Sequence, residues 1–72
     1  MTIFKTEKWD GFGRQNYYWH EYRLEENQVV KYKCHKFKLL ENGKEDWCIE
    51  EQREESWLFN DPDLPEFLKE YL

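Results

Sequence analysis

The chain has 72 residues, of which 39% are hydrophobic, 38% charged and 19% aromatic, and its formal net charge is −5. This length predicts one domain, residues 1–72, that buries only about 60% of the surface its unfolded form exposes. The aromatic content excludes a disordered chain. The longest apolar runs are three residues, whereas a membrane-spanning helix needs about 20.

The N-terminal residues Met1 to Trp9 carry three charged side chains and contain no apolar stretch. They therefore do not resemble a secretory signal. The two cysteines, Cys34 and Cys48, are too few for a disulfide scaffold and are expected as free thiols. We therefore expect a cytoplasmic protein that has no membrane attachment and needs no cofactor.

The first half of the chain predicts two main strands. Residues 3–8 favour a short strand, and residues 9–13, with two glycines, favour a loop. Residues 16–24 are rich in tyrosine and tryptophan, which is typical of a strand. A polar turn at 25–28 then leads into a strand over 29–40, where apolar and basic residues alternate.

The second half begins with the strongest turn signal, Asn42-Gly43, which marks a hairpin. Residues 45–51 form its second strand. The acidic stretch 50–55 is ambiguous, because its composition favours helix while it lacks apolar residues at helical spacing. It continues the strand or forms a turn, and a further short strand is expected over 55–59.

Cross-strand pairing predicts a register for each hairpin. Pairing Leu24 with Val30, and Leu40 with Lys44 around a three-residue loop, brings apolar residues together and sets opposite charges side by side. In the second hairpin Phe37 then faces Trp47 and His35 faces Ile49. Along residues 29–40 the apolar side chains change from one face of the strand to the other. A β-bulge or a strong twist near His35-Lys36 explains this change, or both faces of the sheet are partly covered.

The C-terminus predicts an amphipathic helix over 64–72. Asp63 and Glu66 have the spacing of a capping box. The apolar residues follow at helical intervals: Leu64, Phe67, Leu68, Tyr71 and Leu72. The predicted fold class is therefore α+β, a small antiparallel β-meander of three to four strands with one C-terminal helix docked on the sheet.

Catalytic and metal-binding signals are weak. His20, Cys34 and Cys48 could share a face and bind zinc, but no paired spacing of cysteines or histidines supports a metal. A reactive Cys34 thiolate would have its pKa lowered by Lys33, His35 and Lys36, but a free cysteine is more often a buried hydrophobe, which is the favoured interpretation. The sequence predicts no enzyme and no metal, and a small metal- or ligand-binding domain remains the least favoured alternative.

A lysine-rich strand is the basis of a second hypothesis. Basic side chains can hold phosphates while aromatic side chains stack on bases. A single-stranded nucleic-acid-binding module would use the residues of strand 31–38, namely Lys31, Lys33, Lys36 and Lys38 with Tyr32 and Phe37. The acidic net charge disfavours this alternative, as do the carboxylates expected on the neighbouring strands.

The leading hypothesis is a small non-catalytic protein-interaction or regulatory module. The aromatic residues exceed what one thin core requires, and aromatic residues are enriched at partner surfaces. The expected partner-binding residues cluster around the glycine loop and the start of the next strand: Trp9, Phe12, Tyr17 and Trp19. The partner is expected to be a protein, or a second copy of the chain in a homodimer paired through exposed edge strands.

Overall fold

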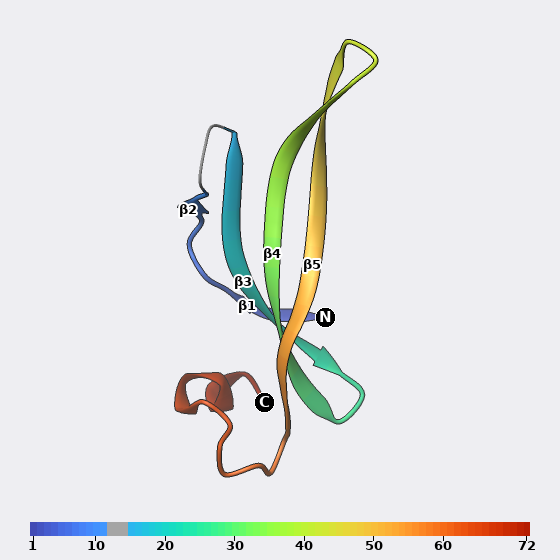
Figure 1. Cartoon of the computed structure of the whole chain (residues 1–72). Helices are drawn as coiled ribbons and strands as arrows, with labels where there is room; N and C mark the ends of the chain where they lie inside the picture. Colours follow the sequence, from blue (N-terminus) through green and yellow to red (C-terminus); the bar gives the residue numbers. More distant parts are fainter. Residues whose placement is uncertain (12–14) are drawn as a thin grey trace.

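The fold is a small antiparallel β-sheet with little helix, and the computed structural model describes residues 1–11 and 15–72 (Figure 1). Its elements are β1 (Thr2–Lys5), β2 (Trp9–Asp10), β3 (Asn16–Glu25), β4 (Gln28–Glu41), β5 (Lys44–Leu58) and a short 3-10 helix, η1 (Glu66–Tyr71). The strands are ordered β1-β3-β4-β5, and β2 also pairs with β3. The predicted antiparallel meander is therefore confirmed, with five strands instead of three or four.

The hairpin between β4 and β5 closes with a two-residue turn. Asn42 has a φ of 51° and Gly43 a φ of 78°, and two positive φ values are the requirement of a type I′ turn. Leu40 consequently pairs with Glu45. The predicted three-residue loop and the pairing of Leu40 with Lys44 were wrong by one residue.

The hairpin between β3 and β4 differs from the prediction in the same way. Glu25 pairs with Gln28 across a two-residue turn, and Leu24 pairs with Val29 instead of Val30. A shift of one residue changes which side chains of the two strands share a face. Glu26 opens this turn with a φ of 56°, a left-handed conformation that costs most residues about 1–2 kcal/mol.

Replacing Glu26 by glycine is therefore expected to raise the free energy of unfolding by about 0.5–1 kcal/mol. This gain is the backbone strain that glycine relieves, minus the cost of the larger conformational entropy of glycine in the unfolded state. Urea denaturation measures this change. Asn27→Gly is the matched control, because Asn27 is not among the residues with positive φ and its replacement should not stabilise. Equal effects of the two variants would contradict the turn geometry.

The one irregularity in the β4–β5 pairing lies between Lys31 and Tyr32, so the predicted position near His35-Lys36 was wrong. Lys31 pairs with Glu55 and Tyr32 with Arg53, which leaves Glu54 as the extra residue of a bulge. The change of apolar side chains from one face of β4 to the other is explained by partial cover on both faces of the sheet. Cys34 is buried on one face, and Phe37 is half-buried on the other.

Two segments are extended, of which one was left open between strand and turn and the other was expected as a loop. The acidic stretch 50–55 belongs to β5, which joins the predicted strands 45–51 and 55–59 into one. Trp9 and Asp10, expected in a loop, form β2 because they pair with Tyr18 and Tyr17. In both cases pairing with a neighbouring strand outweighs local propensity.

The predicted amphipathic helix over 64–72 was wrong, because the structure has only the 3-10 helix η1. Its N-terminus, Pro65, makes no side-chain capping bond, and the backbone N–H of Asp63 donates to the Asp61 side chain instead of entering a capping box. Leu68 N–H donates to the Pro65 carbonyl, three residues back. Short segments often adopt this tighter helix, and its side chains at i and i+3 also share a face.

The core lies at the end of the sheet that η1 covers. It contains Tyr22 of β3, Val29 of β4, Trp57 of β5 and the buried Leu64 and Leu68. The β4–β5 hairpin extends away from this end (Figure 1). The Cα radius of gyration is 15.0 Å, whereas a compact chain of this length has about 11 Å. The molecule is therefore elongated, and one layer of strands forms the half that lies far from η1.

Candidate functional site

The two faces of the sheet carry different side chains, because successive strand residues alternate. The helix face, which η1 covers at one end, carries Tyr18, His20 and Tyr22 of β3. The opposite face carries Tyr17, Trp19 and the adjacent β3 positions. Tyr22 contacts Phe67 of η1 with ring centroids 5.4 Å apart, which fixes this assignment.

A charge network occupies the opposite face at the middle of the sheet. Glu21 is buried and accepts hydrogen bonds from Trp19 Nε1 at 2.8 Å and from Arg23 at 3.0 and 3.1 Å. Arg23 also forms two hydrogen bonds with Glu51 of β5, at 2.7 and 2.8 Å, across the ring of Tyr32 in β4. The network ties three strands together and has a structural role.

The pKa values in this network follow from its geometry. Burial raises the pKa of the Glu21 carboxyl, but hydrogen bonds from Trp19 and Arg23 and the charges of Arg23 and Lys5 outweigh burial, so the pKa lies below 4.5. Hydrogen bonds from Arg23 also lower the pKa of Glu51. Both carboxylates are therefore held in the charged form.

The helix face carries a row of rings across three strands. Trp9 lies beside Tyr18, with centroids 5.9 Å apart, and Tyr18 stacks on His35 at 4.2 Å. His35 in turn stacks on Phe37 at 4.9 Å. Because the rings contact one another in series, much of their surface is already used within the protein.

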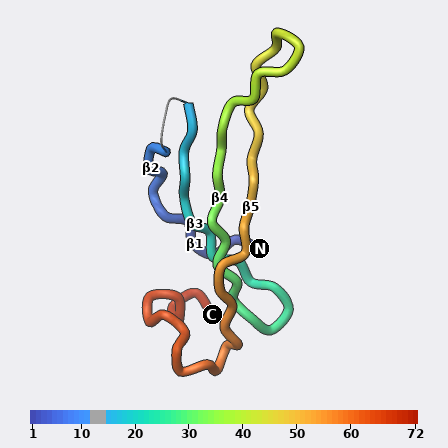
Figure 2. The backbone as a smooth tube through the Cα atoms, viewed as in Figure 1, coloured from blue at the N-terminus to red at the C-terminus, as the bar shows by residue number. Residues whose placement is uncertain are grey.

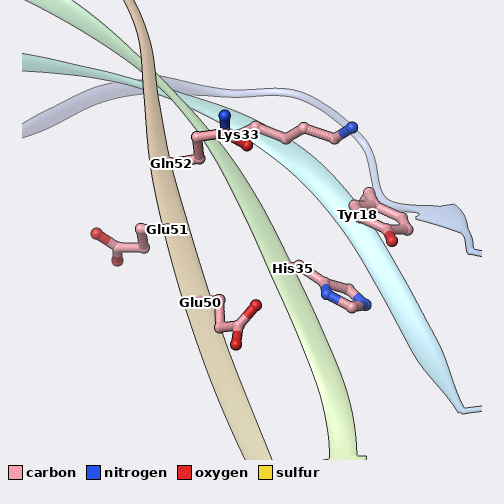
Figure 3. A pocket seen from close by; sticks show the side chains of 6 residues that line it. All are labelled: Tyr18, Lys33, His35, Glu50, Glu51 and Gln52. Carbon is pink, nitrogen blue, oxygen red and sulfur yellow. The ribbon is translucent and has the colours of Figure 1, made fainter.

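A cavity of about 490 Å³ adjoins this row. Its lining consists of Tyr18, Lys33, His35, Glu50, Glu51 and Gln52 (Figure 3). The Glu50 carboxylate points toward His35, whereas Glu51 points away. The lining combines a cation, an imidazole and a carboxylate but contains no serine or cysteine.

The predicted reactive and metal-binding groups are not brought together. Cys34 is fully buried and pairs with Trp19, so it lies on the opposite face from His20. Burial raises the pKa of Cys34 to about 11, so the favoured interpretation of Cys34 as a buried residue is confirmed and the reactive-thiolate alternative is not supported. In the described ranges no group of three or more histidine, cysteine or acidic side chains is placed to hold a metal ion.

The two most exposed apolar residues in the strands of the described ranges, Leu40 and Ile49, lie on the half of the β4–β5 hairpin that is far from η1. The last pair between β3 and β4 joins Asn16 to Phe37, so residues 38–47 form a two-stranded ribbon without β3. On the opposite face this ribbon and its base carry an apolar patch, which consists of Tyr17, Leu40, Trp47 and Ile49. The Tyr17 and Trp47 rings lie 6.0 Å apart, and the amines of Lys36 and Lys38 lie over Trp47.

The four predicted partner-binding residues do not form one surface. Trp9 is 42% exposed on the helix face. Trp19 is buried on the opposite face in the Glu21 network, and Tyr17 belongs to the apolar patch. Phe12 lies outside the described residues.

The four lysines of the nucleic-acid hypothesis divide between the faces. Lys31 and Lys33 lie on the helix face, where Lys31 pairs with Glu54 at 3.8 Å and Lys33 lies over the Tyr18 ring. Lys36 and Lys38 lie on the opposite face over Trp47, and Lys38 also pairs with Glu45 at 3.4 Å. Tyr32 and Phe37 are likewise on different faces.

Sequence reasoning missed Trp47, Ile49 and Leu40 as surface residues. One signal was present: the predicted strand 29–40 is longer than its neighbour 16–24, so part of the second hairpin has to extend past the first. Apolar residues in such an extension cannot be covered by the preceding strand. Trp47 was instead expected to face Phe37, but Phe37 pairs with Cys48.

No helix in the described part of the chain is both long enough and apolar enough to cross a membrane. Comparisons of the chain with protein-family models, curated proteins and solved structures find no match.

Proposed function

We propose that this chain is a non-catalytic protein-interaction module that binds a partner protein through the apolar patch. The observation that carries this proposal is the exposure of Leu40, Trp47 and Ile49, at 68%, 44% and 57%. They lie on or beside a two-stranded ribbon, an element that is marginally stable alone in water. Covering them would contribute about 25 cal/mol per Å² of apolar surface.

The chemistry of the other candidate site supports binding over catalysis. The thiol of Cys34 is buried and has a raised pKa, so it is a poor nucleophile. The cavity beside Tyr18 is polar and lies on an open sheet face, whereas small-molecule sites are mostly apolar and deep. The nucleic-acid alternative has less support, because its lysines do not share a face.

The test compares two tryptophans of nearly equal exposure on opposite faces, Trp47 at 44% and Trp9 at 42%. The protein is purified gently from its own host and analysed by native mass spectrometry. A bound partner is identified, and its affinity for the two variants is measured. Trp47→Ser is expected to weaken binding about 30-fold, because buried interface tryptophans often contribute 2 kcal/mol or more. Trp9→Ser should bind normally.

Three outcomes would overturn the proposal. A loss with Trp9→Ser but not with Trp47→Ser would move the site to the helix face. A nucleic acid in place of a protein would favour the lysine hypothesis, and its affinity would fall steeply with salt. A chain that carries no bound protein and forms no crosslink from a photoreactive residue at Ile49 would exclude a docking patch.

A further inference from the structure

β5 is an open edge of the sheet along its whole length. Its 15 residues, apart from the bulge residue Glu54, pair with β4 on one side, and among the described residues no strand pairs with the other side (Figure 2). Every residue of β5 except Cys48 and Trp57 is exposed. An exposed edge presents unpaired backbone N–H and C=O groups, which can accept another strand.

The charges along this edge are largely of one sign. Residues 44–58 contain six carboxylates and two cations, Lys44 and Arg53. Charged side chains on an edge discourage pairing with a strand of like charge. An acidic edge discourages acidic segments but attracts a basic one.

The two faces of β5 select different side chains in the added strand. On the opposite face, Trp47 and Ile49 are exposed members of the apolar patch. On the helix face, Asp46 and Glu50 lie on either side of Cys48, four residues apart. Neither carboxylate forms an ion pair within the described ranges, whereas Glu45 and Glu51 pair with Lys38 and Arg23.

We propose that a basic segment of the partner protein adds to β5 as an extra antiparallel strand. Its side chains on one face are apolar and contact Trp47 and Ile49. On its other face, two Lys or Arg residues four positions apart lie beside Asp46 and Glu50. Directly opposed side chains on paired strands are about 4.5–5.5 Å apart at Cβ, which is close enough for both kinds of contact. This inference rests on the proposed function and specifies how the partner binds.

A second copy of the chain fits the same edge poorly. Two copies of β5 can pair antiparallel around a two-fold axis at Cys48. This pairing places Trp47 of each copy beside Ile49 of the other. It also places Asp46 opposite Glu50 in both halves, and like charges directly opposite are destabilising. The charge pattern therefore favours a basic segment of a different protein.

The probe for this proposal is the acetylated and amidated peptide Val-Lys-Val-Thr-Val-Lys-Val, labelled with a fluorophore. In the antiparallel register its lysines lie beside Glu50 and Asp46, and its threonine lies beside Cys48. Binding to the full chain is measured by fluorescence anisotropy at low and at moderate salt. We expect saturable binding that weakens with salt, and no binding of the same peptide with glutamate in place of lysine.

Variants of the protein test the charge contacts. Asp46→Asn and Glu50→Gln should each weaken binding by up to about fivefold, as expected for cross-strand charge pairs. Glu55→Gln is the matched control, because it removes the same charge from the same strand beyond the reach of a seven-residue peptide centred on Cys48. Equal losses with all three variants would overturn the proposed register.

Backbone methylation tests strand addition itself. Alternate amides of an extended strand point to opposite edges, so two peptides are methylated on the two alternate sets of backbone nitrogens. One should bind as the parent does, and the other should not bind. Equal binding of both peptides would exclude an added strand. If the free chain forms a dimer and the peptide does not disrupt this dimer, the edge belongs to a second copy of the chain.

The two proposals can fail separately. If no peptide binds while the host partner still depends on Trp47, strand addition is wrong and the proposed function stands. If that dependence is also absent, both proposals are wrong.

Discussion

Leu68→Ala is expected to lower the free energy of unfolding by about 3 kcal/mol. Leu68 is fully buried and packs in the cluster of Tyr22, Val29, Trp57 and Leu64. Truncating a buried leucine removes its transfer free energy and leaves a cavity, at a cost of about 2–5 kcal/mol. A domain of this size has a total stability of only about 5–10 kcal/mol, so the variant should be partly unfolded at moderate urea.

Leu72→Ala is the matched control, because this leucine lies four residues further along the chain and is 49% exposed. Its effect should be within about 0.5 kcal/mol, as for most surface substitutions. Urea unfolding followed by tryptophan fluorescence measures both variants. Equal effects would mean that η1 is not docked on the sheet in solution.

The outcome at η1 also explains what the sequence could and could not predict. The apolar intervals correctly indicated that Leu68 in η1 and Leu64 just before it face the core, since both are buried, whereas Phe67 and Tyr71 of the same stripe are 44% and 43% exposed. They could not separate an α-helix from a 3-10 helix, because i, i+3 neighbours share a face in both. A segment this short has little helical stability of its own and takes the geometry that packing allows.

The strands were predictable for a different reason. Alternation of aromatic and charged residues identified β3 and β4, and Asn42-Gly43 identified the second turn. The register was not predictable from pairing preferences alone, because the slipped alignment also set apolar residues beside one another. Turn geometry decided it. The two-residue turns moved Cys34 opposite Trp19 and so removed the predicted grouping of Cys34 with His20.

The candidate binding surface was predicted least well. Tyr17 was identified, but Trp47 and Ile49 were assigned to pairing inside the sheet. Trp47 lies past the last pair between β3 and β4, and Ile49 lies on the edge strand β5. Both positions are properties of tertiary structure. Trp19, expected at the surface, donates a hydrogen bond to the buried Glu21, a contact between two residues of the same strand face that composition does not indicate.

Arg23→Met is expected to lower the free energy of unfolding by about 2–3 kcal/mol at neutral pH. The substitution preserves much of the side-chain volume but leaves the buried Glu21 carboxylate without its main cation, and uncompensated buried charges are costly. The hydrogen bond from Trp19 and the Lys5 amine at 3.8 Å remain, which limits the loss. Arg53→Met is the matched control, because Arg53 lies two residues after Glu51 on the same strand and is exposed.

The pH dependence distinguishes this charge effect from a simple loss of packing. In the wild type the folded pKa values of Glu21 and Glu51 lie below 4.5. Their contribution to stability is therefore complete above about pH 4.5 and is lost as the pH falls through the folded values. In Arg23→Met, burial of Glu21 is no longer outweighed, so its folded pKa should rise and protonation should favour the folded state. Carbon-13 NMR titration of the Glu21 carboxyl measures this shift, and an unchanged pKa in the variant would show that Arg23 does not hold the buried charge.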